Sequence, residues 1–530
     1  MFFLRESIGI SPRTENLSGG TAPEKIFTNQ PEIQMNAQAQ AGAYALPQAA
    51  KFVREHWRRI AAISAIVLLP CFWHRRIIAT DLGSHLYNAW LAHLIERGQA
   101  PGLWLSGQKT NVLVDYLLNG FGDLFGLRAA EKIVVPLCVL IFFWGLFALV
   151  IAATRRAPWL LVPCLALVSY DWTFHMGFFN YYVSLGFAFF GVAILWRGKG
   201  WERLAALALA PLIVVAHPFG LIWLAGAGVY VVIAEILPRR YQTALFAAAL
   251  ASIYAAHWYF WHRYIVEPPP GPFYFYNGAD QLVIFGDRYE IAEFALIAFF
   301  AIAIAVDIFR NWRSTGLWNR YGTAAQLYLI MGAGIILLPR GVRFAGHPAA
   351  IALITDRLTT ISAALACCIL GAMRPRKWHF FASAAIAALF FTFLYQDTGV
   401  INNLEAQAER LTGALPPNQR VLATIDGLSG YRVSIEHIID QACIGHCFNY
   451  GNYEPGSEVF RVRATPGNAY VIPNFGDATD TEEGNYVVQP EDLPIYQVYQ
   501  CTDDGKTLCI RSLQAGEAND RTGLSHQDDQ

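Results

Sequence analysis

Residues 133–153 read IVVPLCVLIFFWGLFALVIAA, and no other part of the chain constrains its architecture so strongly. The stretch carries no charged side chain, and about 20 consecutive apolar residues are what an α-helix needs to cross the hydrocarbon core of a bilayer. The whole chain has 530 residues, of which 55% are hydrophobic and only 15% are charged. A soluble domain carries about 25% charged residues. The sequence therefore predicts an all-α polytopic membrane domain.

Further apolar runs flank this one, and together they predict about eleven transmembrane helices. The predicted spans are 57–73, 133–153, 159–170, 178–196, 204–216, 219–237, 241–261, 290–308, 321–338, 358–373 and 378–395. We expect this transmembrane domain to cover 51–396, with a first external loop at 74–131. The preceding residues, 1–50, are rich in Gln, Asn, Ser and Ala and lack apolar periodicity, which predicts a disordered cytoplasmic tail.

Lys and Arg are distributed as the positive-inside rule requires. If the N-terminus is cytoplasmic, alternate loops hold the basic clusters, and an odd number of spans places the C-terminus outside. The basic residues of these loops are Arg155, Arg156, Arg197, Lys199, Arg203, Arg239, Arg240, Arg310, Arg313, Arg320, Arg374, Arg376 and Lys377. The formal net charge is -1, so we expect membrane lipids and no nucleic acid among the partners.

After residue 395 the composition becomes that of a soluble protein. Runs at 420–425, 459–464, 470–473 and 495–501 favour strands, and 434–442 favours a helix. The pattern predicts a small extracytoplasmic α+β domain over 397–513, followed by a disordered tail over 514–530.

Four of the nine cysteines lie in this C-terminal part, as the local pairs Cys443 with Cys447 and Cys501 with Cys509. Both pairs fit disulfides formed in an oxidising compartment. Zinc binding through Cys443, His446 and Cys447 is the alternative, but this set lacks an identified fourth ligand.

The best indication of chemistry is TDLGSHLY at 80–87, directly after the first predicted span. It places Asp81 and His85 one helical turn apart. Residues 83–97 continue with apolar positions at helical spacing, which predicts an amphipathic helix in the membrane interface. There Asp81 stays solvated, faces a lipid-borne substrate, and shares a proton or a metal ion with His85. The alternative is that Asp81 only caps the interfacial helix.

The layout from Thr80 to Arg156 resembles that of the GT-C superfamily of integral membrane glycosyltransferases, which includes the protein mannosyltransferases and the aminoarabinose transferases. The matching features are Asp81, a helix ending in Glu96-Arg97-Gly98, Trp104, a second juxtamembrane helix ending in Leu124-Phe125-Gly126, and a span ending in Arg155-Arg156. The resemblance implies transfer of a sugar from a polyprenyl-phosphate carrier at the outer face of the membrane, with Asp81 serving the acceptor or a metal ion. Many members have two adjacent acids, whereas here Leu82 follows Asp81.

The second predicted outer loop repeats the same spacing with Asp171 and His175. In the family that this layout resembles, an acid of the second loop assists at the active site. The resemblance therefore makes Asp171 the second candidate for catalysis, with His175 beside it, and makes Asp81 and Asp171 candidate ligands of a divalent metal ion. The alternative is an interfacial belt of aromatic residues with a capping aspartate.

Arginines cluster in the predicted outer segment 339–357. Because arginine stays charged and binds phosphate oxygens with two hydrogen bonds, Arg340, Arg343 and Arg357 are the candidate ligands of a lipid phosphate. For Arg357 the alternative is neutralisation by the adjacent Asp356.

Transfer from a lipid phosphate needs a base, stabilisation of the leaving phosphate and an apolar groove for the lipid tail. We therefore expect a hexosyl- or pentosyltransferase of the cell envelope. It would move a sugar from a polyprenyl-phosphate donor to a glycan, lipid or protein acceptor at the outer face of a bacterial-type inner membrane. The second hypothesis is a transporter or lipid flippase, although the sequence shows neither a clear repeat nor a mid-span charge ladder. The third is a noncatalytic membrane scaffold with an external binding domain, for which Asp81 is dispensable.

Overall fold

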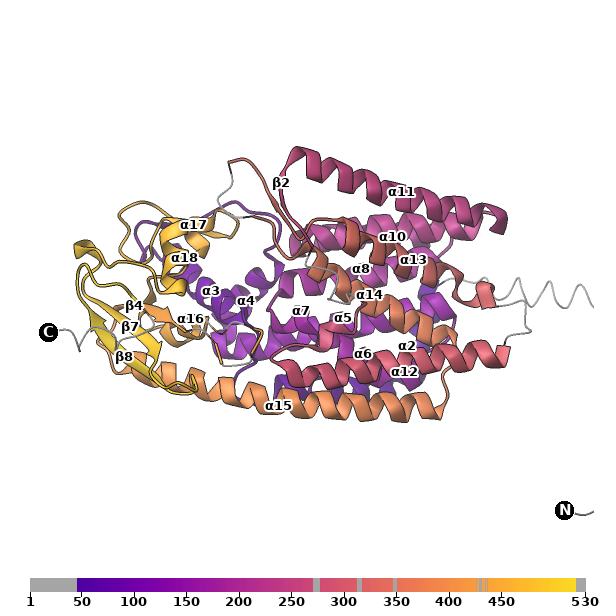
Figure 1. Ribbon diagram of the computed structural model, residues 1–530, viewed down its shortest axis with the longest axis horizontal. Helices are drawn as coiled ribbons and strands as arrows, with labels where there is room; N and C mark the ends of the chain where they lie inside the picture. The colour runs from indigo at the N-terminus through magenta and orange to yellow at the C-terminus, as the bar shows by residue number, and fades with distance from the viewer. Residues whose placement is uncertain are drawn as a thin grey trace, which may run out of the picture. The chain divides into compact units, whose positions relative to one another are not determined.

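The computed structural model describes residues 45–269, 277–311, 317–346, 350–425, 427–428, 431–433, 435 and 437–520. Over these residues the chain is mostly helical, with a few small sheets (Figure 1). The predicted N-terminal tail lies outside the described residues as far as residue 44. Its last six residues belong to helix α2 (Ala45–Val67), so the first helix begins earlier than the apolar run indicates.

Within the described part of the chain, seven helices are long and apolar enough to cross a bilayer. They are α5 (Leu127–Thr154), α8 (Phe179–Arg197), α10 (Pro218–Ile236), α11 (Arg239–Arg263), α12 (Glu290–Asn311), α14 (Ile354–Ala372) and α15 (Lys377–Gly413). A shorter apolar helix, Tyr321–Leu337, forms most of α13 (Leu317–Leu337). The apolar stretch at 133–153 lies inside α5, as expected.

Three other predicted spans also form helices. These helices are too short or too polar to meet the length and apolar composition of a membrane-crossing helix. Helix α6 (Val162–Ser169) has 8 residues and α9 (Glu202–Ala216) has 15, whereas about 20 are needed to cross the hydrocarbon core. Helix α2 is long enough but contains several charged side chains, among them Arg58 and Arg59. The predicted count of about eleven therefore exceeds the number of helices that meet the length and composition of a span.

Helices α5 and α8 approach each other closely in the helical bundle. A Cβ atom at Gly145 would clash with the backbone carbonyl of Gly186, and a Cβ atom at Gly186 would lie 2.9 Å from the backbone of Ile141. Small residues at such crossings let two helix backbones pack closely. Within lipid this packing is what stabilises helix association, because the hydrophobic effect does not act between the helices. Phe142 and Tyr182 stack one turn away, with ring centroids 4.1 Å apart. This contact fixes the first turn of α8, which borders the candidate site.

The C-terminal part contains a four-stranded sheet in the order β5–β4–β7–β8. The strands are β4 (Arg420–Thr424), β5 (Phe448–Asn449), β7 (Ile495–Gln500) and β8 (Leu508–Leu513), and the helices around them are α16 (Ile438–Cys443), α17 (Glu454–Ser457) and α18 (Phe475–Glu483). Strand β4 pairs in parallel with β5 and β7, and β8 runs antiparallel to β7. Three of the predicted strands, at 420–425, 459–464 and 495–501, contain β4, β6 (Val462–Ala464) and β7, whereas residues 470–473 form no strand.

This sheet is not a domain separate from the helices, in contrast to the predicted division at residue 396. Helix α15 passes through that position without a break and extends from the bundle to the sheet (Figure 1). Strand β1 (Leu103–Leu105) of the first loop pairs antiparallel with β6 (Val462–Ala464) of the C-terminal part. The described residues from Ala45 onward form one compact unit. The change of composition therefore falls within α15, which keeps Ile401, Leu404 and Ala408 buried beyond it.

Ordered structure continues beyond the predicted boundary at residue 513. Val487 forms an isolated β-bridge with Ala518, and Asn519 is fully buried. The Asn519 side chain donates to the Thr481 carbonyl at 2.7 Å and to Thr424 Oγ1 at 3.2 Å. Residues 514–520 therefore belong to the fold, because their buried polar groups find partners there. The rest of the predicted tail, 521–530, lies outside the described residues.

Candidate functional site

Helix α3 (Leu82–Glu96) is buried, although its sequence predicts a helix in the membrane interface. Ten of its residues, between Leu82 and Ala92, are buried, and it packs against α4 (Leu113–Phe125) and α16. Gly83 lies so close to the backbone carbonyl of His437 that a Cβ atom would clash with it. The predicted helix is present, but the C-terminal part covers the face that was expected to meet the membrane.

Asp81 lies at the N-terminal boundary of α3 without capping it. Its side chain makes no capping hydrogen bond to the helix and is 28% exposed. The Asp81 backbone N–H donates to the Met176 carbonyl at 3.2 Å. Gly177, at φ +80°, packs against the same nitrogen, and a Cβ atom there would lie 2.6 Å away. These contacts hold the Asp81 backbone and leave its carboxylate accessible from solvent.

His85 pairs with Asp115 of α4, whereas the sequence suggested that it pairs with Asp81. His85 Nδ1 lies 2.9 Å from Asp115 Oδ1, and Asn180 donates to Asp115 Oδ2 at 2.9 Å. Burial opposes the charged imidazole, but Asp115, with smaller contributions from Glu454 and Asp81, outweighs burial and raises the pKa of His85 to about 9. The pKa of Asp115 is lowered, because the charge of His85 outweighs the effect of burial. The predicted sharing of a proton or metal by Asp81 and His85 is therefore replaced by a His85–Asp115 ion pair.

Helix α17 adds a further carboxylate beside this ion pair. Ser84 Oγ donates to Glu454 Oε1 at 2.6 Å, and Asn88 donates to Ser84 Oγ at 3.1 Å. Burial raises the pKa of Glu454 to about 7, against the lowering effect of His85 and Ser84. The side chains of α3 are thus contacted both by the helix that follows it and by the C-terminal part of the chain.

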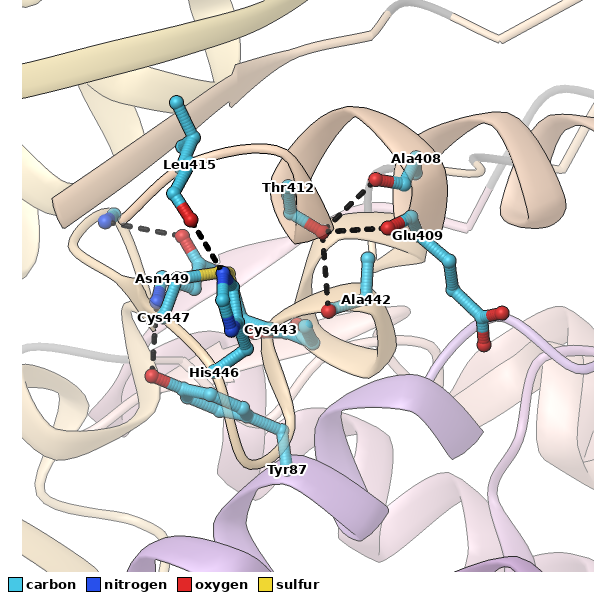
Figure 2. The surroundings of a disulfide bond; sticks show 12 residues. Tyr87, Ala408, Glu409, Thr412, Leu415, Ala442, Cys443, His446, Cys447 and Asn449 are labelled. Atoms are coloured by element: carbon cyan, nitrogen blue, oxygen red, sulfur yellow. Dashed lines mark hydrogen bonds between the residues drawn. A yellow bond between two sulfur atoms is a disulfide. The ribbon is translucent and has the colours of Figure 1, made fainter. Parts of the chain in front are cut away.

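His437, which directly precedes α16, approaches Asp81 on a different side. His437 Nε2 lies 3.9 Å from Asp81 Oδ1, and its Nδ1 lies 2.7 Å from Asp440 Oδ2. Asp440 also accepts a hydrogen bond of 2.6 Å from the Asn449 side chain. The Asn449 backbone N–H donates to the Tyr87 hydroxyl of α3 at 2.9 Å (Figure 2). A carboxylate–imidazole–carboxylate series therefore connects α3 to α16.

A disulfide between Cys443 and Cys447 closes the loop after α16 (Figure 2). Within this loop His446 Nε2 bonds to the Leu415 carbonyl at 2.9 Å. The other expected pair, Cys501 with Cys509, is also joined by a disulfide. Since their sulfur atoms bond to each other, Cys443 and Cys447 do not form the zinc site considered as the alternative.

Arg357 lies in the first turn of α14, beside the first turn of α8. Its guanidinium carbon is 4.4 Å from the Phe178 ring centroid and 5.8 Å from that of Tyr181. The Tyr181 hydroxyl donates to the Arg357 carbonyl at 2.7 Å. Among the described residues, the buried Arg357 Nε has no hydrogen-bond partner, and no carboxylate forms an ion pair with this side chain. Its guanidinium therefore retains capacity for an anionic ligand.

Arg357 interacts electrostatically with two other groups of the site, Asp81 and His217. It interacts electrostatically with Asp81 across the start of α14. Burial, followed by the charge of Arg357, lowers the pKa of His217 to about 3. His217 precedes α10, and its Nδ1 accepts from the Phe219 backbone N–H at 3.2 Å. A neutral imidazole and a charged guanidinium thus lie at the adjoining ends of these helices.

The other two candidate arginines have different surroundings. Arg340 donates to Asp356 Oδ2 at 3.2 Å and lies 3.4 Å from Glu267 Oε1. Asp356 is therefore the hydrogen-bond partner of Arg340, and its charge also acts on the Arg357 guanidinium. Arg343 lies on β3 (Gly341–Arg343), which pairs with β2 (Ile265–Glu267), and its side chain is exposed. Of the three arginines, Arg340 is paired with carboxylates, Arg343 is exposed, and Arg357 is the buried one whose Nε has no hydrogen-bond partner among the described residues.

An apolar cavity of about 690 Å³ lies between α10, α11, α13 and α14, and its lining includes Tyr181, which hydrogen-bonds to Arg357, and Leu358, which follows Arg357 in the chain. It is also lined by Ile354, Trp223, Leu245, Ala249 and Met331. Helix α11 has no buried residue and lies on the outer side of α10 and α13 (Figure 1). The size and lining suit a hydrocarbon chain.

The second predicted acid–histidine pair has structural contacts. Asp171 Oδ1 accepts from the Phe174 backbone N–H at 3.0 Å and caps the short helix α7 (Trp172–His175). Burial raises the pKa of Asp171 to about 7. His175 Nδ1 lies 3.0 Å from the Ile78 carbonyl, and burial lowers its pKa to about 3. These contacts match the alternative in which Asp171 is a capping residue, and they place the following Gly177 against Asp81.

The described residues contain no group of three or more side chains suited to holding a metal ion. Asp171 is fully buried and its Oδ1 caps α7, whereas its Oδ2 has no hydrogen-bond partner among the described residues. We therefore derive no chemical step through a metal.

Sequence reasoning missed four polar residues of the site, Asp115, His437, Asp440 and Glu454. For Asp115 a signal was available, because it interrupts the apolar pattern of a helix. The other three carry no local signal, since they lie far from Asp81 in the sequence and reach it only through folding.

The chain matches no protein-family model, no curated protein and no solved structure. Its function must therefore be argued from the site itself.

Proposed function

We propose that this protein is a GT-C-like membrane glycosyltransferase that moves a sugar from a polyprenyl-phosphate donor to a hydroxyl group of an acceptor. One observation carries the proposal. Tyr181 and Leu358, the neighbours of Arg357, line the apolar cavity, and the charge of Arg357 interacts with Asp81 as well as with Asp356. A groove for the tail, a cation for the phosphate and a carboxylate for the acceptor proton are the three parts that this reaction requires.

In this proposal the cavity and Arg357 bind the donor. Its polyprenyl tail occupies the groove between α10, α11, α13 and α14, where the lining is apolar. Its phosphate then lies at the end bordered by Tyr181 and Ile354, next to the guanidinium of Arg357. A guanidinium beside apolar surroundings attracts phosphate more strongly than one in water, because the local dielectric constant is lower.

Asp81 acts as the base for the acceptor. It accepts the proton of the acceptor hydroxyl while the hydroxyl oxygen attacks the anomeric carbon. The bond from that carbon to the phosphate oxygen breaks, and its electron pair leaves with the polyprenyl phosphate. The leaving phosphate gains one negative charge, which Arg357 stabilises. A single displacement of this kind inverts the anomeric centre.

In this proposal the site lies at the outer face of a bacterial-type inner membrane. At the opposite ends of α8 and α10, Arg197 forms an ion pair with Glu235 at 2.8 Å, and this end carries the basic loops expected in the cytoplasm. The two disulfides lie in the C-terminal part that contributes to the site, which fits an oxidising periplasm.

The test uses purified full-length protein in liposomes. Polyprenyl phosphates that carry a radiolabelled hexose or pentose are the donors, and an extract of cell-envelope glycans, lipids and proteins supplies the acceptors. We expect protein-dependent movement of label from donor to acceptor, and its loss in Asp81→Asn. The matched control is Asp123→Asn on α4, because Asp123 is a half-exposed acid held by His93 at 2.9 Å.

Retention of all label on the donors, for every sugar tested, would contradict the proposal. Movement of the intact labelled lipid between leaflets would then identify a flippase, read from its accessibility to a reagent outside the liposomes. Transfer that is unchanged in Asp81→Asn would keep the enzyme and remove Asp81 as its base.

A further inference from the structure

We infer that His437, held by Asp440, is a positioning residue that binds the Asp81 carboxylate as a cation and fixes its orientation toward the acceptor. The catalytic consequence rests on the proposed function. The ion pair itself can be tested without any transfer reaction.

His437 lies between two carboxylates. Asp81 Oδ1 is 3.9 Å from Nε2, and Asp440 Oδ2 is 2.7 Å from Nδ1. An imidazole has a proton for both nitrogens only in its charged form, and carboxylates on both sides favour that form. In its charged form His437 also lowers the pKa of Glu454. The arrangement therefore places a cation behind Asp81.

The surroundings give His437 little freedom to move. Its side chain is 7% exposed, and its backbone carbonyl packs against Gly83, where α3 has no room for a side chain. Asp440 is held by the Asn449 side chain, and the Asn449 backbone is held by Tyr87 of α3 (Figure 2). Helices α3 and α16 are thus fixed to each other on both sides of the Asp81–His437 contact.

The Cys443–Cys447 disulfide adds a covalent constraint to this connection. It closes the loop between α16 and Asn449 (Figure 2), and Asn449, which bonds to Asp440, lies two residues after Cys447. Thr412 of α15 donates to the Ala442 carbonyl at 3.2 Å, which anchors the end of α16 to the long helix. The cation is therefore positioned by α15 and the C-terminal part together.

An aspartate that is held through one oxygen presents the other oxygen in a defined direction. Such orientation lowers the barrier of the chemical step without improving the binding of substrate. Loss of His437 should therefore lower kcat and leave KM nearly unchanged. A purely structural role would instead lower the amount of folded protein and leave the kcat of the folded fraction intact.

The first experiment reads the charge at His437 through a thiol at position 81. The five free cysteines are all buried, so the thiol of Asp81→Cys is the accessible one, and its alkylation by iodoacetamide is followed against pH in full-length protein. A neighbouring cation lowers the pKa of a thiol, and we expect it to be about one unit lower with His437 than in Asp81→Cys combined with His437→Gln. His446→Gln is the matched control. Equal thiol pKa values with and without His437 would overturn the ion pair.

The second experiment measures transfer kinetics in the Asp81 protein. We expect His437→Gln to lower kcat about tenfold or more with KM changed by less than about twofold. Asp440→Asn should have a smaller effect of the same kind, and His446→Gln none. An unchanged kcat in folded His437→Gln, or in Asp440→Asn if the first variant does not fold, would overturn the positioning role. Failure of the wild-type protein to transfer any sugar would overturn the proposed function, while the thiol titration would still decide the ion pair.

Discussion

Two aspartate–histidine pairs with the same spacing, Asp81 with His85 and Asp171 with His175, have opposite surroundings in this molecule. Asp171 is fully buried and caps α7, and His175 is neutral against a backbone carbonyl. Asp81 starts α3 without capping it, keeps an accessible carboxylate, and has Arg357 and His437 in range. His85 is turned to Asp115 of another helix.

The difference teaches that an i, i+4 spacing of acid and base identifies a helix start but does not say what the side chains do there. When an aspartate at a helix start caps the helix, its carboxylate accepts hydrogen bonds from backbone N–H groups of that helix. It is available for chemistry when other contacts hold the helix start, as Met176 and Gly177 do for Asp81. The comparison leads to four predictions.

The largest expected effect separates the two aspartates directly. We expect Asp81→Asn to lower sugar transfer by about 10³-fold, because the base of the reaction is removed. Asp171→Asn should change transfer by less than about twofold, because asparagine caps a helix as well as aspartate does. Initial rates of label transfer, normalised to folded protein, provide the measurement. Equal losses in both variants would end the functional distinction between the pairs.

The second prediction concerns Arg357, whose charge interacts with Asp81. We expect Arg357→Gln to raise the KM for the lipid-linked donor about tenfold and to lower kcat as well, because the phosphate loses its cation before and during departure. Arg343→Gln is the control, since Arg343 is exposed on β3. Donor titration at fixed acceptor gives both constants. A loss of similar size in the control would show that the effect is one of general surface charge.

The third prediction uses the different protonation of the two histidines. The pKa of His85 is raised from 6.5 to about 9 in the folded protein, mainly by Asp115 acting against burial. The extra stability is therefore fully present below pH 6.5 and is lost as the pH rises through 9. We expect the melting temperature in detergent to fall between pH 7 and 9, and this slope to disappear in His85→Gln.

His175→Gln provides the matched control for that slope. Burial lowers the pKa of His175 to about 3, so this side chain is neutral in the folded protein throughout the window from pH 7 to 9. His175 should affect the pH dependence of the melting temperature only below pH 6.5, where this side chain becomes charged in the unfolded chain. A slope between pH 7 and 9 that survives His85→Gln would contradict the His85–Asp115 ion pair.

The smallest expected effect is on the free energy of unfolding. Here we expect the substitution of Asp171 to have the larger effect and that of Asp81 the smaller one. Asp171→Ala removes a helix cap and should lower the free energy of unfolding by about 1 kcal/mol. Asp81→Ala removes no cap and should change it by less than about 0.5 kcal/mol. Melting temperatures of the two variants, measured side by side, decide the order. A larger loss for Asp81→Ala would mean that its carboxylate supports the helix after all.

Much of the helical part followed from local pattern. The predicted spans all lie in helices, because an apolar run satisfies its own backbone hydrogen bonds only as a helix. Two of the predicted spans form helices shorter than a membrane crossing, α6 and α9, and the count of about eleven stays a prediction. The predicted division at residue 396 falls inside α15, because a change of composition along the chain does not by itself end a helix.

The site was predictable only in part. Asp81 and Arg357 were found from residue type and position, but their partners were assigned from proximity in the sequence. Asp356 pairs with Arg340 and His85 with Asp115, because neighbouring side chains on a helix point in different directions and each finds its partner on another element.

The sequence by itself determined that the chain is mostly helical with spans of membrane length, and which cysteines lie close enough in the chain to form local disulfides. Both follow from interactions within a few residues, since apolar length and loop length are local properties. Only the tertiary structure decided that α3 is covered, that His437 and Glu454 reach the start of this helix, and that neighbours of Arg357 line the apolar cavity. These features depend on contacts between residues far apart in the chain, which are set by how the helices pack.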